Sequence, residues 1–211
     1  ISMTQVAIVY HSGYGHTRRM AQAVADGAAE SAQVQQIEID AEGNVPESAW
    51  ATLLAADAIV FGSPTYMGTV SWQFKKFADA SSKPWFGQKW KDKLAAGFTN
   101  SASMNGDKHS TLHYLMTLAM QHSMLWVGTG MMPVNNKAAT RDDINNVGSS
   151  GGLMTVTPSD ASVDEMVAGD LATASAELAK GWPEAKGASV QPTDLDAAYA
   201  TLASSGKGGY G

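Results

Sequence analysis

Apolar runs alternate with amphipathic segments five times along the chain, and this alternation limits the possible folds more than any other feature. The apolar runs predict strands at residues 5–10, 34–40, 57–62, 94–101 and 124–128. The remaining patterns predict helices at residues 17–29, 46–55, 70–79, 107–122 and 161–181. Repeated strand–helix alternation produces a parallel sheet that is covered by helices on both faces. The sequence therefore predicts a single doubly wound α/β domain.

The composition is that of an ordinary globular protein, and it excludes several kinds of site. The 211 residues include no cysteine, so disulfides, thiolate metal sites, iron–sulfur clusters and a cysteine nucleophile are excluded. The net charge of −6 argues against a nucleic-acid partner. Because no signal peptide and no apolar run of about 18 residues is found, we expect a cytoplasmic protein without a membrane span. We expect residues 1–182 to form the domain and the Gly/Ala-rich residues 183–211 to form a loosely held tail.

Ligands of doubly wound sheets bind beyond the carboxyl ends of the strands, so the loops that follow strands are the informative segments. Four such loops stand out, at residues 10–17, 62–69, 99–105 and 128–160. The first loop combines two glycines, which permit a tight turn, with hydroxyl donors and the start of a helix. Because N–H groups at a helix N-terminus attract anions, it predicts a phosphate cradle built largely from neutral groups. Its members are Ser12, Gly13, Tyr14, Gly15, His16 and Thr17.

Other interpretations of the first loop are open from the residues alone. A Walker A loop requires a Gly-Lys pair, which this loop lacks. A dinucleotide fingerprint requires a third glycine where the chain has Arg18, although Asp40 stands where a ribose-binding acid would be. The simplest alternative is a capped glycine turn that binds nothing.

The second and third loops offer groups that suit a flat ring with a polar edge. The second loop comprises Pro64, Thr65, Tyr66, Met67 and Gly68, and the third comprises Asn100, Ser101, Ala102, Ser103, Met104 and Asn105. Backbone amides of the second loop would face the polar edge of a ring, and its side chains would contact the faces. Hydroxyl and amide donors of the third loop would add to the same edge.

Four motifs, in this order, resemble those of the WrbA-type NAD(P)H:quinone oxidoreductases within the flavodoxin-like superfamily. The motifs are SGYGHT, GSPTYMG, PWFGQKWKDKLAAGFTNS and LAMQHSMLWVG, and the resemblance covers residues 6–128. It implies a flavodoxin-like three-layer sandwich with a five-stranded parallel sheet. It also implies FMN as the cofactor, with the phosphate at residues 12–17 and the ring at residues 64–68 and 100–105.

The resemblance also implies roles for single side chains. Tyr14 matches a tyrosine near the nicotinamide nucleotide site. Trp85 matches a tryptophan that closes the substrate pocket, often from a neighbouring subunit. A family histidine at the end of the long helix contacts the flavin, and either Gln121 or His122 matches it.

This chain departs from the family pattern at two positions. Gln121 and His122 stand where the family commonly has two histidines, and Tyr66 and Met67 stand where it often has Arg-Phe. The missing arginine removes a guanidinium group that could bind a phosphate or polarise the flavin edge. The preference between NADH and NADPH is therefore open, whereas backbone groups would carry most of the FMN binding.

The implied function is an FMN-dependent quinone reductase, in which NADH or NADPH delivers hydride to the flavin and a quinone accepts two electrons. No side chain is expected to act as a covalent nucleophile. The implied partners are the nicotinamide nucleotide, the quinone and further copies of the chain in a homodimer or homotetramer. Two alternatives are a flavodoxin-type electron carrier without its own substrate and an interaction protein that has lost the flavin.

Two further patterns match other chemistry only in part. Residues 148–152 match the Gly-x-Ser-x-Gly of a hydrolase elbow around Ser150, but the preceding residues do not predict a strand. His109 and His113 have the spacing of helical metal ligands, but no third ligand is evident. We therefore expect neither a serine hydrolase nor a metal site.

Overall fold

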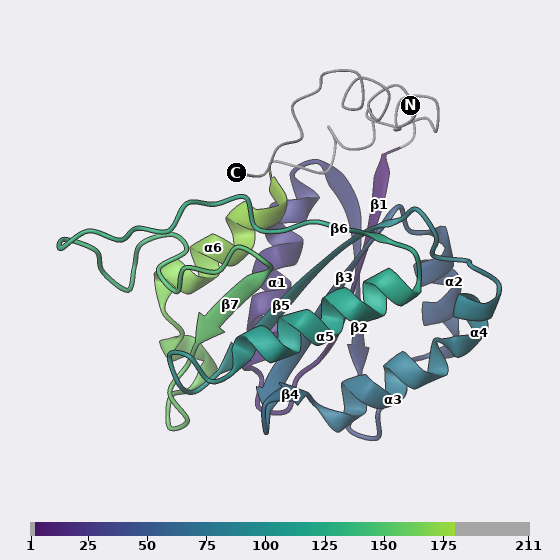
Figure 1. Cartoon of the computed structure of the whole chain (residues 1–211), viewed down its shortest axis with the longest axis horizontal. Coiled ribbons are helices and arrows are strands. Elements are labelled where there is room, and N and C mark those ends of the chain that lie inside the picture. The colour runs from purple at the N-terminus through teal and green to yellow at the C-terminus, as the bar shows by residue number, and fades with distance from the viewer. Residues whose placement is uncertain (1–2, 180–211) are drawn as a thin grey trace, which may run out of the picture.

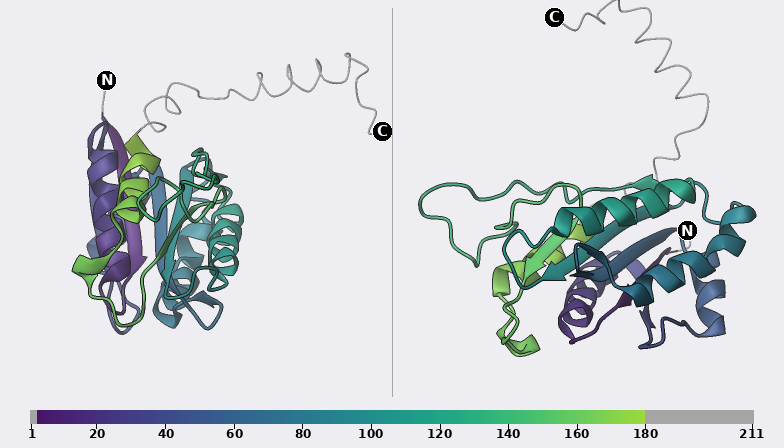
Figure 2. Two further views of the ribbon diagram at one scale, coloured as in Figure 1. Left: turned by 90° about the vertical axis from the view of Figure 1, so that its left-hand side faces the viewer. Right: turned by 60° about the horizontal axis from the view of Figure 1, so that its bottom comes forward.

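The protein forms three layers, in which a parallel sheet lies between two layers of helices (Figure 1, Figure 2). The computed structural model describes residues 3–179. The parallel strands are β1 (Thr4–His11), β2 (Ala32–Ile39), β3 (Ala58–Tyr66), β5 (Leu94–Ser101), β6 (Leu125–Trp126) and β7 (Leu153–Val156). The helices are α1 (His16–Ala29), α2 (Glu47–Ala55), α3 (Trp72–Ala80), α4 (Ser82–Phe86), α5 (Lys108–Gln121) and α6 (Ala168–Ala179). The predicted α/β architecture is confirmed.

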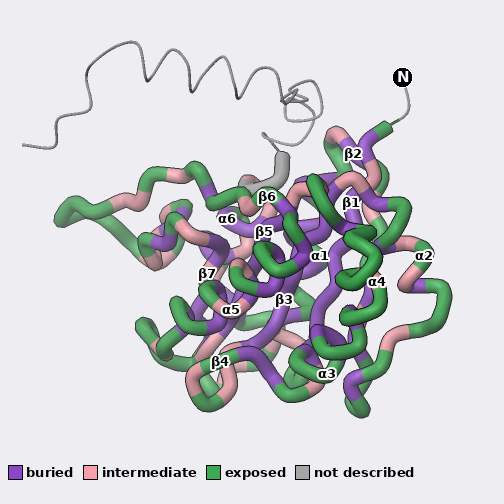
Figure 3. Tube along the Cα trace, turned by 45° about the vertical axis from the view of Figure 1, so that its right-hand side comes forward, coloured by how far each residue is buried: buried purple, intermediate pink, exposed green. Residues whose placement is uncertain are grey.

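Alternate residues of each strand face opposite helical layers, and this divides the core in two. Val6 and Ile8 of β1 belong to the core beneath α1 and α6, whereas Ala7 and Val9 belong to the core beneath α2, α3 and α5. The central strands are therefore buried on both faces, as Figure 3 shows. Burial on both faces explains why these strands are continuous apolar runs in the sequence.

The strand order is β2-β1-β3-β5-β6, which is the flavodoxin-like order that the resemblance implies. The fifth position is divided, because β6 pairs with the start of β5 and β7 pairs with its end. The predicted strand at residues 124–128 is therefore wrong beyond Trp126. The chain leaves the sheet there and returns only at β7, which the sequence analysis assigned to a polar loop. Where it leaves, Gly128 passes so close to the Ser150 carbonyl that a side chain would collide with it.

The predicted second loop is a β-hairpin, because β3 continues through Tyr66 and pairs with the short strand β4 (Thr69–Val70). The two connecting residues, Met67 and Gly68, both have positive φ angles, of 47° and 86°. Two-residue turns of type I′ require this conformation at both positions.

The last helix begins later than predicted. A 3₁₀ helix (Val163–Glu165) precedes it, so α6 starts at Ala168 and not at residue 161. The end of that predicted helix and the predicted tail at residues 183–211 lie outside the described residues. Between residues 3 and 179, none of the helices has the length and apolar character needed to cross a bilayer.

Candidate functional site

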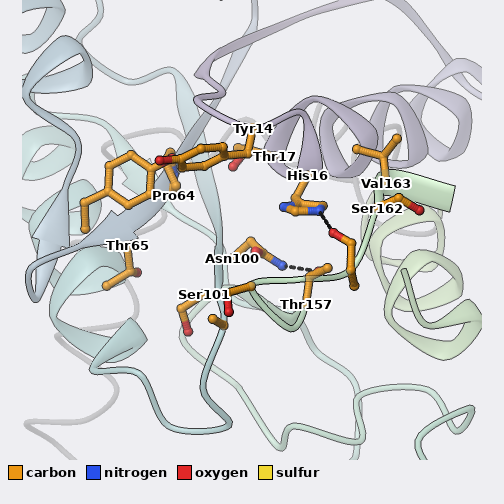
Figure 4. Close-up of a pocket in the computed structure, with 14 residues that line it drawn as sticks. Tyr14, His16, Thr17, Pro64, Thr65, Asn100, Ser101, Thr157, Ser162 and Val163 are labelled. Carbon is orange, nitrogen blue, oxygen red and sulfur yellow. Dashed lines mark hydrogen bonds between the residues drawn. The ribbon is translucent and has the colours of Figure 1, made fainter. Parts of the chain in front are cut away.

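The carboxyl ends of β1, β3, β5 and β7 surround a cavity of about 700 Å³ (Figure 4). The three loops predicted from the sequence contribute Tyr14, His16, Thr17, Pro64, Thr65, Tyr66, Asn100, Ser101 and Ala102 to its lining. A fourth segment contributes Thr157, Ser159, Ala161, Ser162 and Val163. These lining residues offer hydroxyl, amide and imidazole groups, and none of them is a lysine, an arginine or an acid. The cavity lies at the topological switch point of the sheet, where ligands of this fold bind.

The first loop holds its shape through hydrogen bonds from its own backbone to the Ser12 side chain. Ser12 Oγ accepts hydrogen bonds from the N–H groups of Gly15 and Arg18, each at 3.1 Å. Gly15 has a φ of +94°, and a side chain at this position would lie 2.9 Å from Val163. Helix α1 begins at the next residue, His16, so the unpaired N–H groups of its first turn belong to the cavity end of the sheet. This arrangement suits an anion such as a phosphate.

The two residues that could have supported a dinucleotide site are engaged elsewhere. The Arg18 guanidinium forms a two-pronged ion pair with the Glu38 carboxylate, at 2.6 and 2.9 Å. Asp40 Oδ1 accepts hydrogen bonds from the N–H groups of Glu42 and Asn44 in the turn after β2. Together with the flavodoxin-like strand order, these contacts argue against a Rossmann-type site.

The other two partial motifs lack the structure that their chemistry needs. Residues 148–152 lead into the strand β7, whereas a hydrolase elbow leads from a strand into a helix. His109 and His113 are exposed on α5, with their ring centroids 6.4 Å apart. Within residues 3–179, no cluster of three potential His, Asp or Glu ligands is present.

The second loop is anchored to the elements behind it by hydroxyl groups. Thr65 Oγ1 lies 2.8 Å from Thr99 Oγ1 and 2.7 Å from Thr111 Oγ1. These contacts join the end of β3 to β5 and α5. They hold the base of the hairpin at the cavity wall.

Two tyrosines from the first and second loops meet at the cavity. The rings of Tyr14 and Tyr66 pack edge to face, with centroids 6.2 Å apart. A side chain at Gly13 would collide with the Tyr66 hydroxyl, so the glycine permits this close approach. Burial, with a smaller effect from Tyr14, raises the pKa of Tyr66. Its hydroxyl therefore stays protonated at neutral pH and can donate a hydrogen bond.

The start of the third loop is held by the split fifth strand. Asn100 Nδ2 donates to Thr155 Oγ1 at 2.7 Å and to Thr157 Oγ1 at 2.8 Å. Asn100 is buried, so these bonds fix which way its amide faces. The carbonyl oxygen of the amide is left as the group that can serve the cavity.

The fourth wall is formed by residues 157–163. The sequence analysis singled out the loop at residues 128–160 but named no individual site residue in this wall. His16 Nε2 lies 3.0 Å from the Ala161 carbonyl oxygen, which ties this wall to α1 (Figure 4). The Ser162 N–H and hydroxyl both lie 2.8 Å from a Glu165 carboxylate oxygen, which caps the 3₁₀ helix. The short run LMTV followed by Thr-Pro-Ser was the signal for a strand and a turn here.

Lys108 was also missed, and it organises the third loop. It is the first residue of α5 and its exposed fraction is 0%. Its Nζ donates to Ser101 Oγ at 2.8 Å, to the Ser103 carbonyl at 2.7 Å and to the Met104 carbonyl at 2.8 Å. The signal in the sequence was a lysine in the first turn of a helix, where the helix dipole disfavours a cation.

Several predicted site residues do not line the cavity. These residues belong to the three predicted loops but are not among those that line the cavity: Ser12, Gly13, Gly15, Met67, Gly68, Ser103, Met104 and Asn105. Trp85 on α4 and Gln121 at the end of α5 are exposed, and they lie on segments that lead toward the opposite edge of the sheet. Hydrogen bonds between residues 92–93 and 123–125 fix the end of α5 at that edge.

His122 lies in the core at this opposite edge and is 3% exposed. Its ring stacks on Trp90, with the centroids 4.2 Å apart, and its Nε2 lies 2.8 Å from Ser81 Oγ. The Ser81 hydroxyl donates its proton to the Ala78 carbonyl, so the Nε2 of His122 must carry a proton and donate. Burial lowers the pKa of His122 to about 4. These contacts give His122 a structural role within its own chain.

The comparisons with known proteins agree with this geometry. Residues 6–139 match the family described as NADPH-dependent FMN reductase. The chain is 54% identical over 171 residues to the flavodoxin FldP of Pseudomonas aeruginosa (strain UCBPP-PA14), a match that covers 81% of this chain and 91% of that protein. It is 33% identical over 171 residues to an NAD(P)H dehydrogenase (quinone) of Geobacter sulfurreducens, covering 72% of this chain and 83% of that protein.

A solved structure supports the same grouping. The flavodoxin, WrbA-like protein from Agrobacterium tumefaciens superposes with a TM-score of 0.71 and 50% identity. The match covers 87% of this chain and 98% of that one. The family match spans more than half of the chain, and the cavity lies where the predicted motifs meet. The chain therefore belongs to the NADPH-dependent FMN reductase family, as a WrbA-type protein with the flavodoxin-like fold.

Proposed function

We propose that the protein binds FMN in the cavity and uses it to pass two electrons, as hydride, from NADH or NADPH to a quinone. The observation that carries this proposal is the meeting of three loops, each predicted separately from the sequence, around one cavity. Membership of an FMN reductase family supports FMN as the cofactor. Relatives named as quinone dehydrogenases support the quinone as the acceptor.

The FMN phosphate would bind at residues 12–17. The left-handed Gly15 turns the backbone into the first turn of α1, and the buried Thr17 adds a hydroxyl at the cavity wall. No lysine or arginine lines the cavity, so N–H groups, hydroxyls and the helix dipole would supply the attraction. The donor set fits a monophosphate that is held without a strong counter-charge.

The flavin ring would lie between residues 64–68 and 100–105. Pro64 and Thr65 offer an apolar ring and a hydroxyl whose position is fixed by two other threonines. Asn100 offers an amide oxygen with a fixed orientation. Fixed polar groups of this kind orient a flat ring without needing to rearrange when it binds.

Bound FMN would supply the hydride chemistry, and the chain would bind FMN, orient it and restrict the access of water to it. Tyr14, whose side chain is 80% exposed at the mouth of the cavity, offers an aromatic face to a nicotinamide or quinone ring. Tyr66 offers a protonated hydroxyl beside it. No covalent nucleophile is required.

The remaining expected contacts would need a second copy of the chain. Trp85 and Gln121 are exposed, but neither lines the cavity of its own chain. We therefore include a homodimer or homotetramer in the proposal, in which these residues approach the cavity of a neighbour. His122 would take part only through its effect on packing, because Trp90 and Ser81 hold it in the core.

The test begins with FMN binding and ends with turnover. Purified protein is mixed with FMN, and binding is followed by quenching of flavin fluorescence and by visible absorption. The loaded protein is then given NADH or NADPH with benzoquinone. Prompt nucleotide oxidation that depends on both protein and quinone supports the proposal, and the absence of FMN binding would refute it.

A flavodoxin-type electron carrier is the second candidate. Two observations favour it. A relative with 54% identity is named a flavodoxin, and this chain has Tyr66-Met67 where WrbA-type proteins often have an arginine that could hold a nucleotide phosphate. A carrier would bind FMN that dithionite reduces, yet it would oxidise neither NADH nor NADPH at any quinone concentration. The same experiment therefore separates the two functions.

A further inference from the structure

Lys108 presents a buried cation that the family assignment does not explain. All three of its N–H donors are used by the oxygen atoms of Ser101, Ser103 and Met104, and it forms no ion pair among the described residues. Burying an unpaired ammonium group is costly, and the N-terminus of α5 adds an unfavourable dipole. Burial lowers the pKa of Lys108 to about 8, which reflects that cost.

The two charged side chains that influence Lys108, Asp170 and Arg141, form an ion pair with each other. Burial is the largest influence on the pKa of Lys108; Asp170 of α6 raises that pKa and Arg141 of the loop before β7 lowers it, both more weakly than burial acts. Asp170 is itself paired with Arg141 at 3.3 Å and accepts hydrogen bonds from the Val156 N–H and the Asn146 amide. Neither group therefore neutralises the ammonium within contact distance.

Lys108 lies directly behind the cavity wall. Ser101 lines the cavity, and its hydroxyl oxygen accepts the Lys108 hydrogen bond at 2.8 Å. The lysine is thus one side chain removed from the proposed FMN ring, in a wall whose lining residues carry no lysine, arginine or acid. In such surroundings the positive charge is poorly screened and acts on whatever the cavity holds.

We propose that Lys108 sets both the affinity and the reduction potential of bound FMN, by fixing residues 101–104 and by placing a positive charge behind them. This inference rests on the proposed function. A flavin that accepts one hydride gains two electrons and one proton, so its net charge becomes more negative by one unit. The buried ammonium favours that reduced form, and it serves as a positioning residue because it acts through Ser101.

The chain offers a matched control in Lys93. Its Nζ also donates to two carbonyl oxygens, those of Leu54 and Ala56, and burial also lowers its pKa. It lies just before β5, whereas the cavity lies at the other end of that strand. Replacing it removes the same chemistry at a distance from the proposed site.

The experiment compares Lys108→Met, Lys108→Gln and Lys93→Met with the wild type. Fluorescence quenching measures the FMN dissociation constant, and a dye-coupled redox titration measures the midpoint potential. Lys108→Met should bind FMN about tenfold more weakly, because the third loop loses its internal support. It should also lose about tenfold in the preference for reduced over oxidised FMN, which corresponds to a potential lower by about 30 mV. Lys108→Gln should recover much of the affinity but not the potential, and Lys93→Met should change neither.

Measuring the FMN affinity of the wild type as a function of pH tests the same inference without relying on a variant that could fold poorly. FMN affinity should weaken as the pH rises through about 8, and the same change should be absent from Lys108→Gln. The inference is refuted if folded Lys108→Met retains the wild-type affinity and potential, or if Lys93→Met alters them equally. Failure of the wild type to bind FMN would instead refute the proposed function.

Discussion

The two edges of the sheet, formed by the amino and carboxyl ends of its strands, each hold a lysine beside β5, of which Lys93 is half-buried and Lys108 is buried. The contrast between them separates structural from functional chemistry. Lys93 donates to the carbonyls of Leu54 and Ala56 at the C-terminal end of α2, where the helix dipole favours a cation. Lys108 stands at the N-terminal end of α5, where the dipole opposes it. Stability alone accounts for the first lysine. The second holds a loop of the cavity in spite of the energetic cost.

The same contrast extends to other residues at the two edges. His122, at the edge that holds Lys93, is packed against Trp90 and Ser81 and is not among the residues that line the candidate FMN cavity. Gly15, at the edge that holds Lys108, adopts a conformation that serves the first loop. We therefore expect changes at one edge to affect folding and changes at the other to affect FMN.

The largest effect is expected for His122→Ala. The variant loses the stacking on Trp90 and the bond to Ser81 Oγ, and it leaves a hole in the core. The free energy of unfolding should fall by about 3 to 4 kcal/mol, as measured by urea denaturation. FMN affinity at a temperature where the variant is folded should match the wild type, and a tenfold loss would show that the two edges are coupled.

Acid should destabilise the protein through His122 almost as strongly. The folded pKa of about 4 lies below the ordinary value of 6.5, so the unfolded chain binds the proton first. The stabilising effect of the neutral ring is complete above pH 6.5 and is lost as the pH falls from 6.5 to 4, by about 3 kcal/mol.

His122→Gln provides the comparison for this acid effect, because it retains a donor for Ser81 but does not titrate. Its free energy of unfolding should depend less steeply on pH between 6.5 and 4 than that of the wild type. His11, which is also buried with a lowered pKa, should contribute equally to both proteins. Parallel pH curves for the two proteins would contradict the buried neutral state of His122.

At the cavity edge, Gly15→Ala should weaken FMN binding about 30-fold, or about 2 kcal/mol. An alanine at a φ of +94° is strained, and its Cβ would meet Val163 of the fourth wall. Gly130→Ala is the control, because Gly130 also has a positive φ, of 62°, but a side chain there would meet nothing within 4 Å. Equal FMN affinities for the two variants, by fluorescence quenching, would count against a phosphate at the first loop.

The smallest effect is expected for Lys93→Met. The variant loses hydrogen bonds to two carbonyls at the end of α2, which should reduce the free energy of unfolding by about 1 kcal/mol. Thermal denaturation measures this change. A loss of several kcal/mol would mean that Lys93 carries more of the fold than its contacts indicate.

The sequence by itself determined the architecture, because the signals for it are local. Continuous apolar runs of β-branched residues specify strands buried on both faces, and their alternation with helices specifies a parallel sheet. The motif around Gly15 and Thr17 likewise identified the first loop, since a tight turn that enters a helix needs those residue types in that order.

Tertiary structure alone decided how distant segments meet. β7 and the wall after it join the site only because the chain leaves the sheet after Trp126 and returns later. On its return it pairs with the carboxyl end of β5, next to the segment with which β6 pairs. No local pattern names the hydrogen-bond partners of Lys108 and Lys93, and those partners distinguish a loop support from a helix cap. His122, one of the two residues that the sequence offered for the flavin contact, is held in the core by Trp90 and Ser81. Local sequence encodes conformation, whereas burial and the identity of a hydrogen-bond partner depend on residues far along the chain.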